Sequence, residues 1–238
     1  MGDFDSAAWS NSLMVTEFFN DAHRGDMPLC WPVVTNLVNR APHVINRMYN
    51  TATPQDYFTA GDNGFGYNNV YSYIDPARPL RSDGKALNGT LQTYYERTKY
   101  EFDKFGISFH SFCLSTVGSN AEVENMFAKL CPGGILSNYR RNGQNPGLID
   151  VNGTPDNLDD DVGFMEMKGL GNNTEYYFKQ YLGNNPQKPA FTAFRAVAVS
   201  PTEIYNGATA LMNSYRVRIV DPYTFMALYK EAVIKGIC

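Results

Sequence analysis

ISFHSFCL, at residues 107–114, and NAEVENMFAKL, at residues 120–130, decide the fold of this chain. The first stretch is apolar, rich in aromatic residues and of strand length, so it predicts a β-strand. The second predicts a helix, because Asn120 suits an N-cap and the apolar residues Val123, Met126, Phe127 and Leu130 recur along one face. A strand followed by an amphipathic helix is one unit of a parallel β/α fold.

The same alternation continues on the N-terminal side of this unit. Strands are predicted at 27–31 and 56–60. A helix after Pro32 is expected to be kinked or split at Pro42, and a helix over 91–105 is ended by Gly106.

On the C-terminal side the strands are predicted at 135–138, 190–199 and 216–220. Residues 140–161 are rich in Gly, Asn, Pro and Asp and are predicted to be the longest loop, which leads through 164–167 into a short helix near 174–182. Two further helices have clear start signals. The first begins near Ser200 to Glu203. The second has Asp221 as N-cap and Pro222 at its first position, and it is predicted to face inward with Phe225, Leu228, Tyr229 and Val233.

With a first strand that ends at Gly2-Asp3-Phe4-Asp5, these runs make seven strands. The chain begins so close to that strand that we expect the strand to be truncated at the N-terminus and an N-terminal part to be missing. We therefore predict an α/β fold, a seven-stranded parallel (β/α) barrel formed by residues 1–238 as a single domain. An open doubly wound sheet is the alternative.

Composition excludes several classes of protein. With 43% hydrophobic residues the chain can bury a core, and 20 basic against 24 acidic residues, a net charge of −4, disfavour a nucleic-acid binder. The apolar run over 191–199 is interrupted by Arg195 and is too short to span a membrane. The four cysteines form no CxxC pair and the three histidines have no metal-ligand spacing, so neither a metal site nor a cofactor is expected.

Asp3 and Asp5 are the first candidate catalytic residues. They lie two apart at the end of a predicted strand, so their side chains point to the same face with Cα atoms about 7 Å apart. Functional groups of a barrel gather at the carboxyl ends of its strands, where two carboxylates can activate a water. Capping or solvation of a DxD turn is the alternative.

A glycine-rich loop follows the strand at 56–60. Gly64 and Gly66 permit positive φ angles and close backbone approach, while Asp62 and Tyr67 supply a carboxylate and a ring for a sugar. The alternative is an ordinary long connection. Trp31, preceded by Arg24, is a candidate for stacking on a pyranose ring, with a core tryptophan as the alternative.

The remaining polar residues are mostly expected to have structural roles. His110 is interpreted as a core strand residue with one satisfied nitrogen. Asp156 and Asp159 to Asp161 lack the alternation and the glycine of an EF-hand loop, which favours a solvated loop. Glu203 is interpreted as a helix-start residue, and Glu166 as an acid that follows the strand at 135–138 and can reach the mouth of the barrel.

Five segments taken in order resemble the GxGYxYP domain family of glycoside hydrolases. They are GDFDSAAW at 2–9, RG at 24–25 with PLCW at 28–31, DYF at 56–58 with AG at 60–61, GFGY at 64–67, and VDPYTF at 220–225. The resemblance spans nearly the whole chain. Asn69 and Val70 depart from it, since they stand where the second tyrosine and the proline are expected.

The resemblance implies a seven-stranded β/α barrel of polysaccharide-degrading gut bacteria, secreted or periplasmic, preceded by a separate domain, with a carboxylate site in the cleft between the two. Asp3 and Asp5 match the paired acids of the family. The resemblance also implies another acid, which in the family lies upstream of this chain. Because the two aspartates are too close to straddle a sugar ring, we expect them to hold one water together, with the acid from the preceding domain and inversion at the anomeric carbon. A non-catalytic carbohydrate-binding barrel and a polysaccharide deacetylase are the alternatives.

Overall fold

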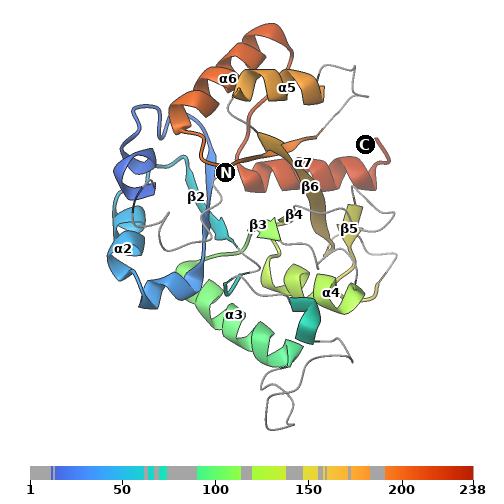
Figure 1. Cartoon of the computed structure of the whole chain (residues 1–238). Helices are drawn as coiled ribbons and strands as arrows, with labels where there is room; N and C mark the ends of the chain where they lie inside the picture. Colours follow the sequence, from blue (N-terminus) through green and yellow to red (C-terminus); the bar gives the residue numbers. More distant parts are fainter. Residues whose placement is uncertain are drawn as a thin grey trace.

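The computed structural model in Figure 1 describes residues 12, 14–61, 64–66, 70–73, 90–113, 120–137, 147–154, 158, 160–170, 173–182 and 191–237. Those residues form an α/β fold with a seven-stranded, mostly parallel sheet. The strands are β1 (Leu29–Val33), β2 (Asp56–Ala60), β3 (His110–Cys113), β4 (Ile135–Ser137), β5 (Gly147–Ile149), β6 (Val162–Leu170) and β7 (Ala193–Ala196).

The sheet runs in the order β1-β2-β3-β4-β6-β5, and β7 also pairs with β6. All of these pairs are parallel except β5 with β6, which is antiparallel. Within the described residues no ladder joins β1 to β7 or β5, so the sheet is open there and is mixed. The closed, wholly parallel barrel of the sequence prediction is therefore not what these ladders form.

The helices are α2 (Pro42–Asn50), α3 (Leu91–Phe105), α4 (Ala121–Leu130), α5 (Thr174–Leu182), α6 (Pro201–Ser214) and α7 (Pro222–Ile234), with short 3₁₀ turns η2 (Phe18–Asn20), η3 (Thr35–Asn39) and η4 (Val70–Tyr73). Most of these helices begin and end at residues whose side chains or backbone angles favour a helix end. Asn120 caps α4 by accepting from two backbone N–H groups, and Gly106 ends α3 at φ 64°. Pro42 starts α2 after η3, which confirms the predicted split.

Two clusters of buried apolar side chains cover the two faces of the sheet. Successive side chains of β4 point to opposite faces of the sheet. Ile135 belongs to the cluster that also contains residues of α2, α3 and α4, whereas Leu136 belongs to the cluster that contains residues of α7. In α7, Met226 and Tyr229 fill the second cluster, and Tyr229 is completely buried. Figure 1 shows α3 and α4 at one side of the sheet and α7 crossing beside β6.

The helix α7 lies at the amino-terminal ends of the parallel strands. Its Tyr223 hydroxyl and that of Ser108, just before β3, are 3.0 Å apart, and the Lys230 ammonium donates to the carbonyl of Asp161, just before β6, at 2.8 Å. Gly134, just before β4, leaves room for Met226, whose Cγ would lie 2.5 Å from a Cβ there.

Three details differ from the sequence prediction. Residues 164–167, predicted to lead from a loop into a helix, belong to the long strand β6, and residues 147–149 inside the predicted loop form β5. Residues 216–220 form no strand, because Val217 and Ile219 pack on the core without entering the sheet. Leu228 of α7, predicted to face inward, is 43% exposed. The predicted first strand, at 2–5, lies outside the described residues.

Candidate functional site

The carboxyl ends of β1 to β4 lie along one edge of the sheet. Val33 pairs with Ala60 at the ends of β1 and β2, and Cys113 pairs with Ser137 at the ends of β3 and β4. In parallel α/β sheets this edge is where ligands bind. The glycine-rich loop leaves β2 at this edge, with the N–H of Gly61 donating to the carbonyl of Val33 at 3.1 Å.

The loop is held on its first side by the residues that follow β1. The buried hydroxyl of Thr35 donates to the carbonyl of Gly64 at 3.2 Å. Gly66 has φ 101°, and a Cβ there would lie 2.5 Å from Nδ2 of Asn36. Glycine adopts this backbone angle at least cost, and the positive φ angles of Gly64 and Gly66 are as the sequence predicted.

On its second side the loop rests on α3. The N–H of Phe65 donates to the Tyr94 hydroxyl at 3.4 Å, and a Cβ on Gly64, at φ 94°, would lie 2.9 Å from both Thr98 and Phe102. The Arg97 guanidinium lies 5.2 Å from the Phe65 ring centroid and donates to the Glu101 carboxylate at 2.8 Å. The described part of the loop is therefore clamped between η3 and α3.

Two hydroxyls lie under this edge within the sheet. Thr59 and Ser111, on neighbouring strands, are both fully buried and hydrogen-bonded to each other, and Thr59 also donates to the carbonyl of Trp31 at 3.4 Å. Their mutual bond satisfies two polar groups inside an apolar sheet. Sequence reasoning missed Thr35, Asn36, Thr59 and Tyr94, although polar residues directly after a buried strand were a usable signal for the first two.

Arg24 and Trp31 lie in a different place. Arg24 donates to Asp56 from Nη2 at 2.7 Å and from Nε at 3.1 Å, and Trp31 donates to the same carboxylate at 2.6 Å. Asp56 opens β2 whereas the glycine loop follows Ala60, so about 13 Å of strand separates the two. Burial raises the pKa of Asp56, but the bonds from Arg24, Thr53 and Trp31 outweigh it and hold the pKa below its ordinary value.

The structure thus brings Gly64 and Gly66 together at the carboxyl edge and leaves Arg24 and Trp31 at the other end of β1 and β2. Asp62 and Tyr67 of the loop, and Asp3 and Asp5 near the N-terminus, lie outside the described residues, so their expected roles stay predictions. The same holds for the substrate contacts predicted for Arg24 and Trp31, whose side chains here are engaged with Asp56.

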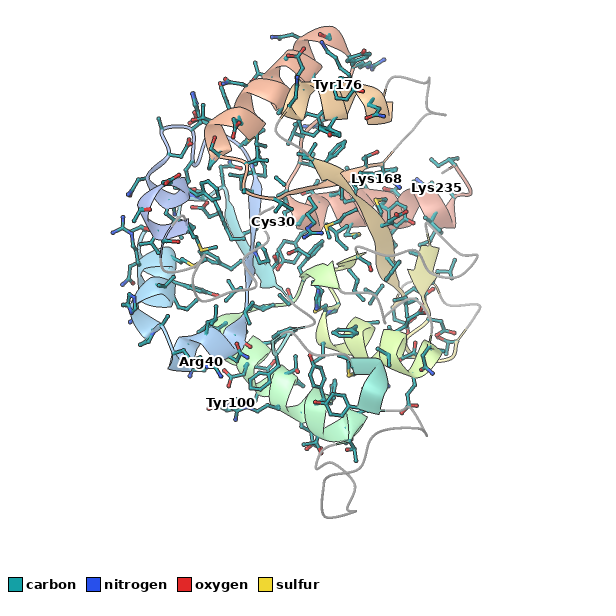
Figure 2. The ribbon with its side chains drawn as sticks, viewed as in Figure 1. Cys30, Arg40, Tyr100, Lys168, Tyr176 and Lys235 are labelled. Atoms are coloured by element: carbon teal, nitrogen blue, oxygen red, sulfur yellow. The ribbon has the colours of Figure 1, made fainter. Side chains whose placement is uncertain are left out.

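Buried titratable groups elsewhere are core residues. Burial lowers the pKa of His110 to about 3, and its ring meets Phe127 edge-on at 5.1 Å, so it is a neutral core histidine as predicted. Burial also raises the pKa of the Cys30 thiol to about 12, and Figure 2 labels Cys30 on β1 near the centre of the view. Neither group is poised for acid–base chemistry near neutral pH.

A family model and a solved structure match this chain. Residues 1–230 match the GxGYxYP putative glycoside hydrolase C-terminal domain. A putative hydrolase from Bacteroides thetaiotaomicron VPI-5482, solved by crystallography, superposes on 97% of this chain with TM-score 0.70 at 18% identity.

The chain spans 44% of that Bacteroides protein, so it corresponds to less than half of a longer polypeptide there. At this identity the likeness shows the fold alone. A comparison with curated proteins finds no match, and no helix among the described residues is long and apolar enough to cross a membrane. Since the family match covers almost the whole chain, the chain belongs to the GxGYxYP putative glycoside hydrolase C-terminal domain family.

Proposed function

We propose that this chain is the water-activating and sugar-binding domain of a glycoside hydrolase that acts on an oligosaccharide or polysaccharide. The observation that carries the proposal is the clamped glycine loop at the carboxyl edge of the parallel strands. Asp62 and Tyr67, which flank the described glycines in a sequence that matches the family, are proposed to face that edge. Aromatic faces with fixed polar groups are what a sugar ring needs.

The proposed chemistry uses Asp3 and Asp5 as a pair. One carboxylate takes a proton from the attacking water and the other orients that water, which then adds to the anomeric carbon. The leaving oxygen is protonated by an acid from a preceding domain, on the opposite side of the scissile bond. This arrangement inverts the anomeric configuration, because a single water attacks from the face opposite the leaving group.

We further propose that the strand predicted at residues 2–5 lies beside the described sheet and closes a (β/α)7 barrel. We propose that the protein is secreted or periplasmic, where polysaccharides are degraded. Arg24 and Trp31 are assigned to support β1 and β2 rather than to touch the sugar, since Asp56 already accepts from both.

The deciding experiment uses the full-length protein. Polysaccharides are screened for release of reducing ends, and the anomer first formed from a substrate is followed by NMR. We expect the inverted product, and at least about a 100-fold loss of kcat in Asp3→Asn or Asp5→Asn. The control is Asp103→Asn, an exposed acid of α3 paired with Lys99.

A retained product would refute the water-activating pair, and full activity of both aspartate variants would remove them from the reaction. Binding of a polysaccharide without any cleavage would instead support a carbohydrate-binding barrel. Acetate release without chain cleavage would support a deacetylase.

A further inference from the structure

Tyr100 of α3 has the most exposed side chain among the large apolar and aromatic residues that the structure describes. Its exposed fraction is 59%, and Figure 2 labels it at the lower left, beside α3. A single exposed aromatic side chain is ordinary on a protein surface. What distinguishes Tyr100 is that its neighbours connect it to the glycine loop.

The guanidinium of Arg97, one turn before Tyr100 on α3, contacts both of these features. Its Cζ atom is 5.6 Å from the Tyr100 ring centroid and 5.2 Å from the ring centroid of Phe65, the loop residue between Gly64 and Gly66. Both distances are in the range of a cation–π contact. Phe65, Arg97 and Tyr100, here called the α3 ledge, therefore extend the glycine loop onto the helix.

A buried carboxylate fixes the guanidinium of the ledge. Nη2 of Arg97 donates to Oε1 of Glu101 at 2.8 Å, and the side chain of Glu101 is only 4% exposed whereas that of Arg97 is 50% exposed. The other N–H groups of Arg97 have no hydrogen-bond partner in the part of the chain that the structure describes. The ledge thus offers fixed, free donors beside an exposed ring, and little side-chain entropy is lost when a ligand binds them.

We propose that the α3 ledge binds neutral sugar units of the polysaccharide, next to the units held by the glycine loop. A pyranose ring has an apolar face and a rim of hydroxyls, which suit a tyrosine ring and free guanidinium N–H groups side by side. The inference rests on the proposed function for its class of substrate. It adds a second binding position, so it favours long chains over short oligosaccharides.

The charges of α3 favour a neutral sugar over an acidic one. The helix carries three basic and three acidic side chains, namely Arg97, Lys99 and Lys104 against Glu96, Glu101 and Asp103. Arg97 is paired with Glu101, and Lys99 with Asp103 at 2.7 Å. A uronate would therefore gain no net attraction from this surface and would approach its carboxylates.

The test is affinity electrophoresis of the full-length protein in gels that contain soluble starch, galactomannan, arabinoxylan or polygalacturonate. We expect at least one neutral polymer to retard the wild type, and Tyr100→Ala to weaken that binding about tenfold. Tyr100→Phe keeps the ring and should bind like the wild type. Neither substitution should change Tm, because the exposed ring fills no core.

The matched control is Tyr176→Ala on α5. Tyr176 is 57% exposed, and Figure 2 labels it at the top, away from Tyr100. This variant should keep the full affinity, and equal losses in the two alanine variants would refute the ledge. Greater dependence of polygalacturonate binding on Tyr100 would refute a neutral sugar. A Tm lowered by Tyr100→Ala would mean that the ring packs on another part of the full-length protein, which also contradicts the proposal.

The ledge and the proposed reaction fail separately. For a polymer that is cleaved, Tyr100→Ala should raise KM and leave kcat unchanged, while short oligosaccharides are cleaved as by the wild type. An unchanged KM would reject the ledge and keep the hydrolase. Retardation that depends on Tyr100 without any cleavage would keep the ledge and reject the hydrolase. Absence of retardation by every polymer would reject the ledge whatever the activity.

Discussion

Asp56, the first residue of β2, forms a buried ion pair with Arg24. The side chain of Asp56 is 1% exposed and that of Arg24 7% exposed, so removal of the carboxylate charge leaves a buried guanidinium without its counterion. We expect Asp56→Asn to lower the free energy of unfolding by about 3–5 kcal/mol at pH 7, measured by urea denaturation. Asp103→Asn, in an exposed pair, should cost less than about 1 kcal/mol.

The same residue predicts a pH dependence. Because the folded-state pKa of Asp56 lies below its ordinary 3.8, its contribution is complete above the unfolded-state pKa and is lost as the pH falls through the folded-state pKa. The difference in stability between wild type and Asp56→Asn should therefore be constant near neutrality and shrink below about pH 4. A difference that grows on acidification would contradict the ion pair as its source.

Gly66 tests whether the glycine loop must approach Asn36 closely. Gly66→Ala adds a Cβ 2.5 Å from Nδ2 of Asn36 at φ 101°, so we expect a loss of about 1–3 kcal/mol in stability and weaker oligosaccharide binding. Gly153→Ala is the matched control, since its φ is 69° but nothing lies within 4 Å of the added Cβ. Equal effects of the two substitutions on binding would show that the contact with Asn36 is irrelevant.

At the scale of elements, helix ends are stabilised by bonds that can be removed one at a time. Ser200 accepts from the N–H of Glu203, and the Glu203 carboxylate accepts from the N–H of Ser200, which makes a reciprocal cap for α6. Ser200→Ala is expected to lower stability by about 1 kcal/mol in thermal unfolding. Ser200→Thr should keep most of it, and a loss as large as that of alanine would mean that the hydroxyl is not the stabilising group.

Two segments, 162–170 and 216–220, show that local strand propensity does not by itself decide which residues join the sheet. The segment 162–170 reads VGFMEMKGL, with methionines and glycines and a single β-branched residue, so its strand propensity is low. It is nevertheless a nine-residue strand, because β4, β5 and β7 all pair with it. Residues 216–220 have the better strand pattern and no ladder, since pairing depends on a partner that is distant in sequence.

For the molecule as a whole, α7 closes the amino-terminal side of the sheet. Tyr229 is fully buried, lies 5.6 Å from the Phe191 ring centroid and donates to the carbonyl of Phe164 at 3.4 Å. We expect Tyr229→Ala to cost about 3–5 kcal/mol and to lower Tm by several degrees, as measured by calorimetry. The adjacent Leu228→Ala, at a position 43% exposed, should be nearly neutral. Equal losses would place the packing interface of α7 elsewhere.

The sequence alone determined the elements whose limits depend on neighbours along the chain. The strand 56–60, the helix 91–105 and the caps Asn120 and Asp221 are as predicted, because turn residues and side-chain periodicity act over a few residues. The clamping of the glycine loop, the hydrogen bonds of Arg24 and Trp31 to Asp56, and the antiparallel pairing of β5 with β6 were decided by tertiary structure alone. Their partners are brought together by sheet register and helix packing, and these long-range contacts leave no periodic mark in the sequence.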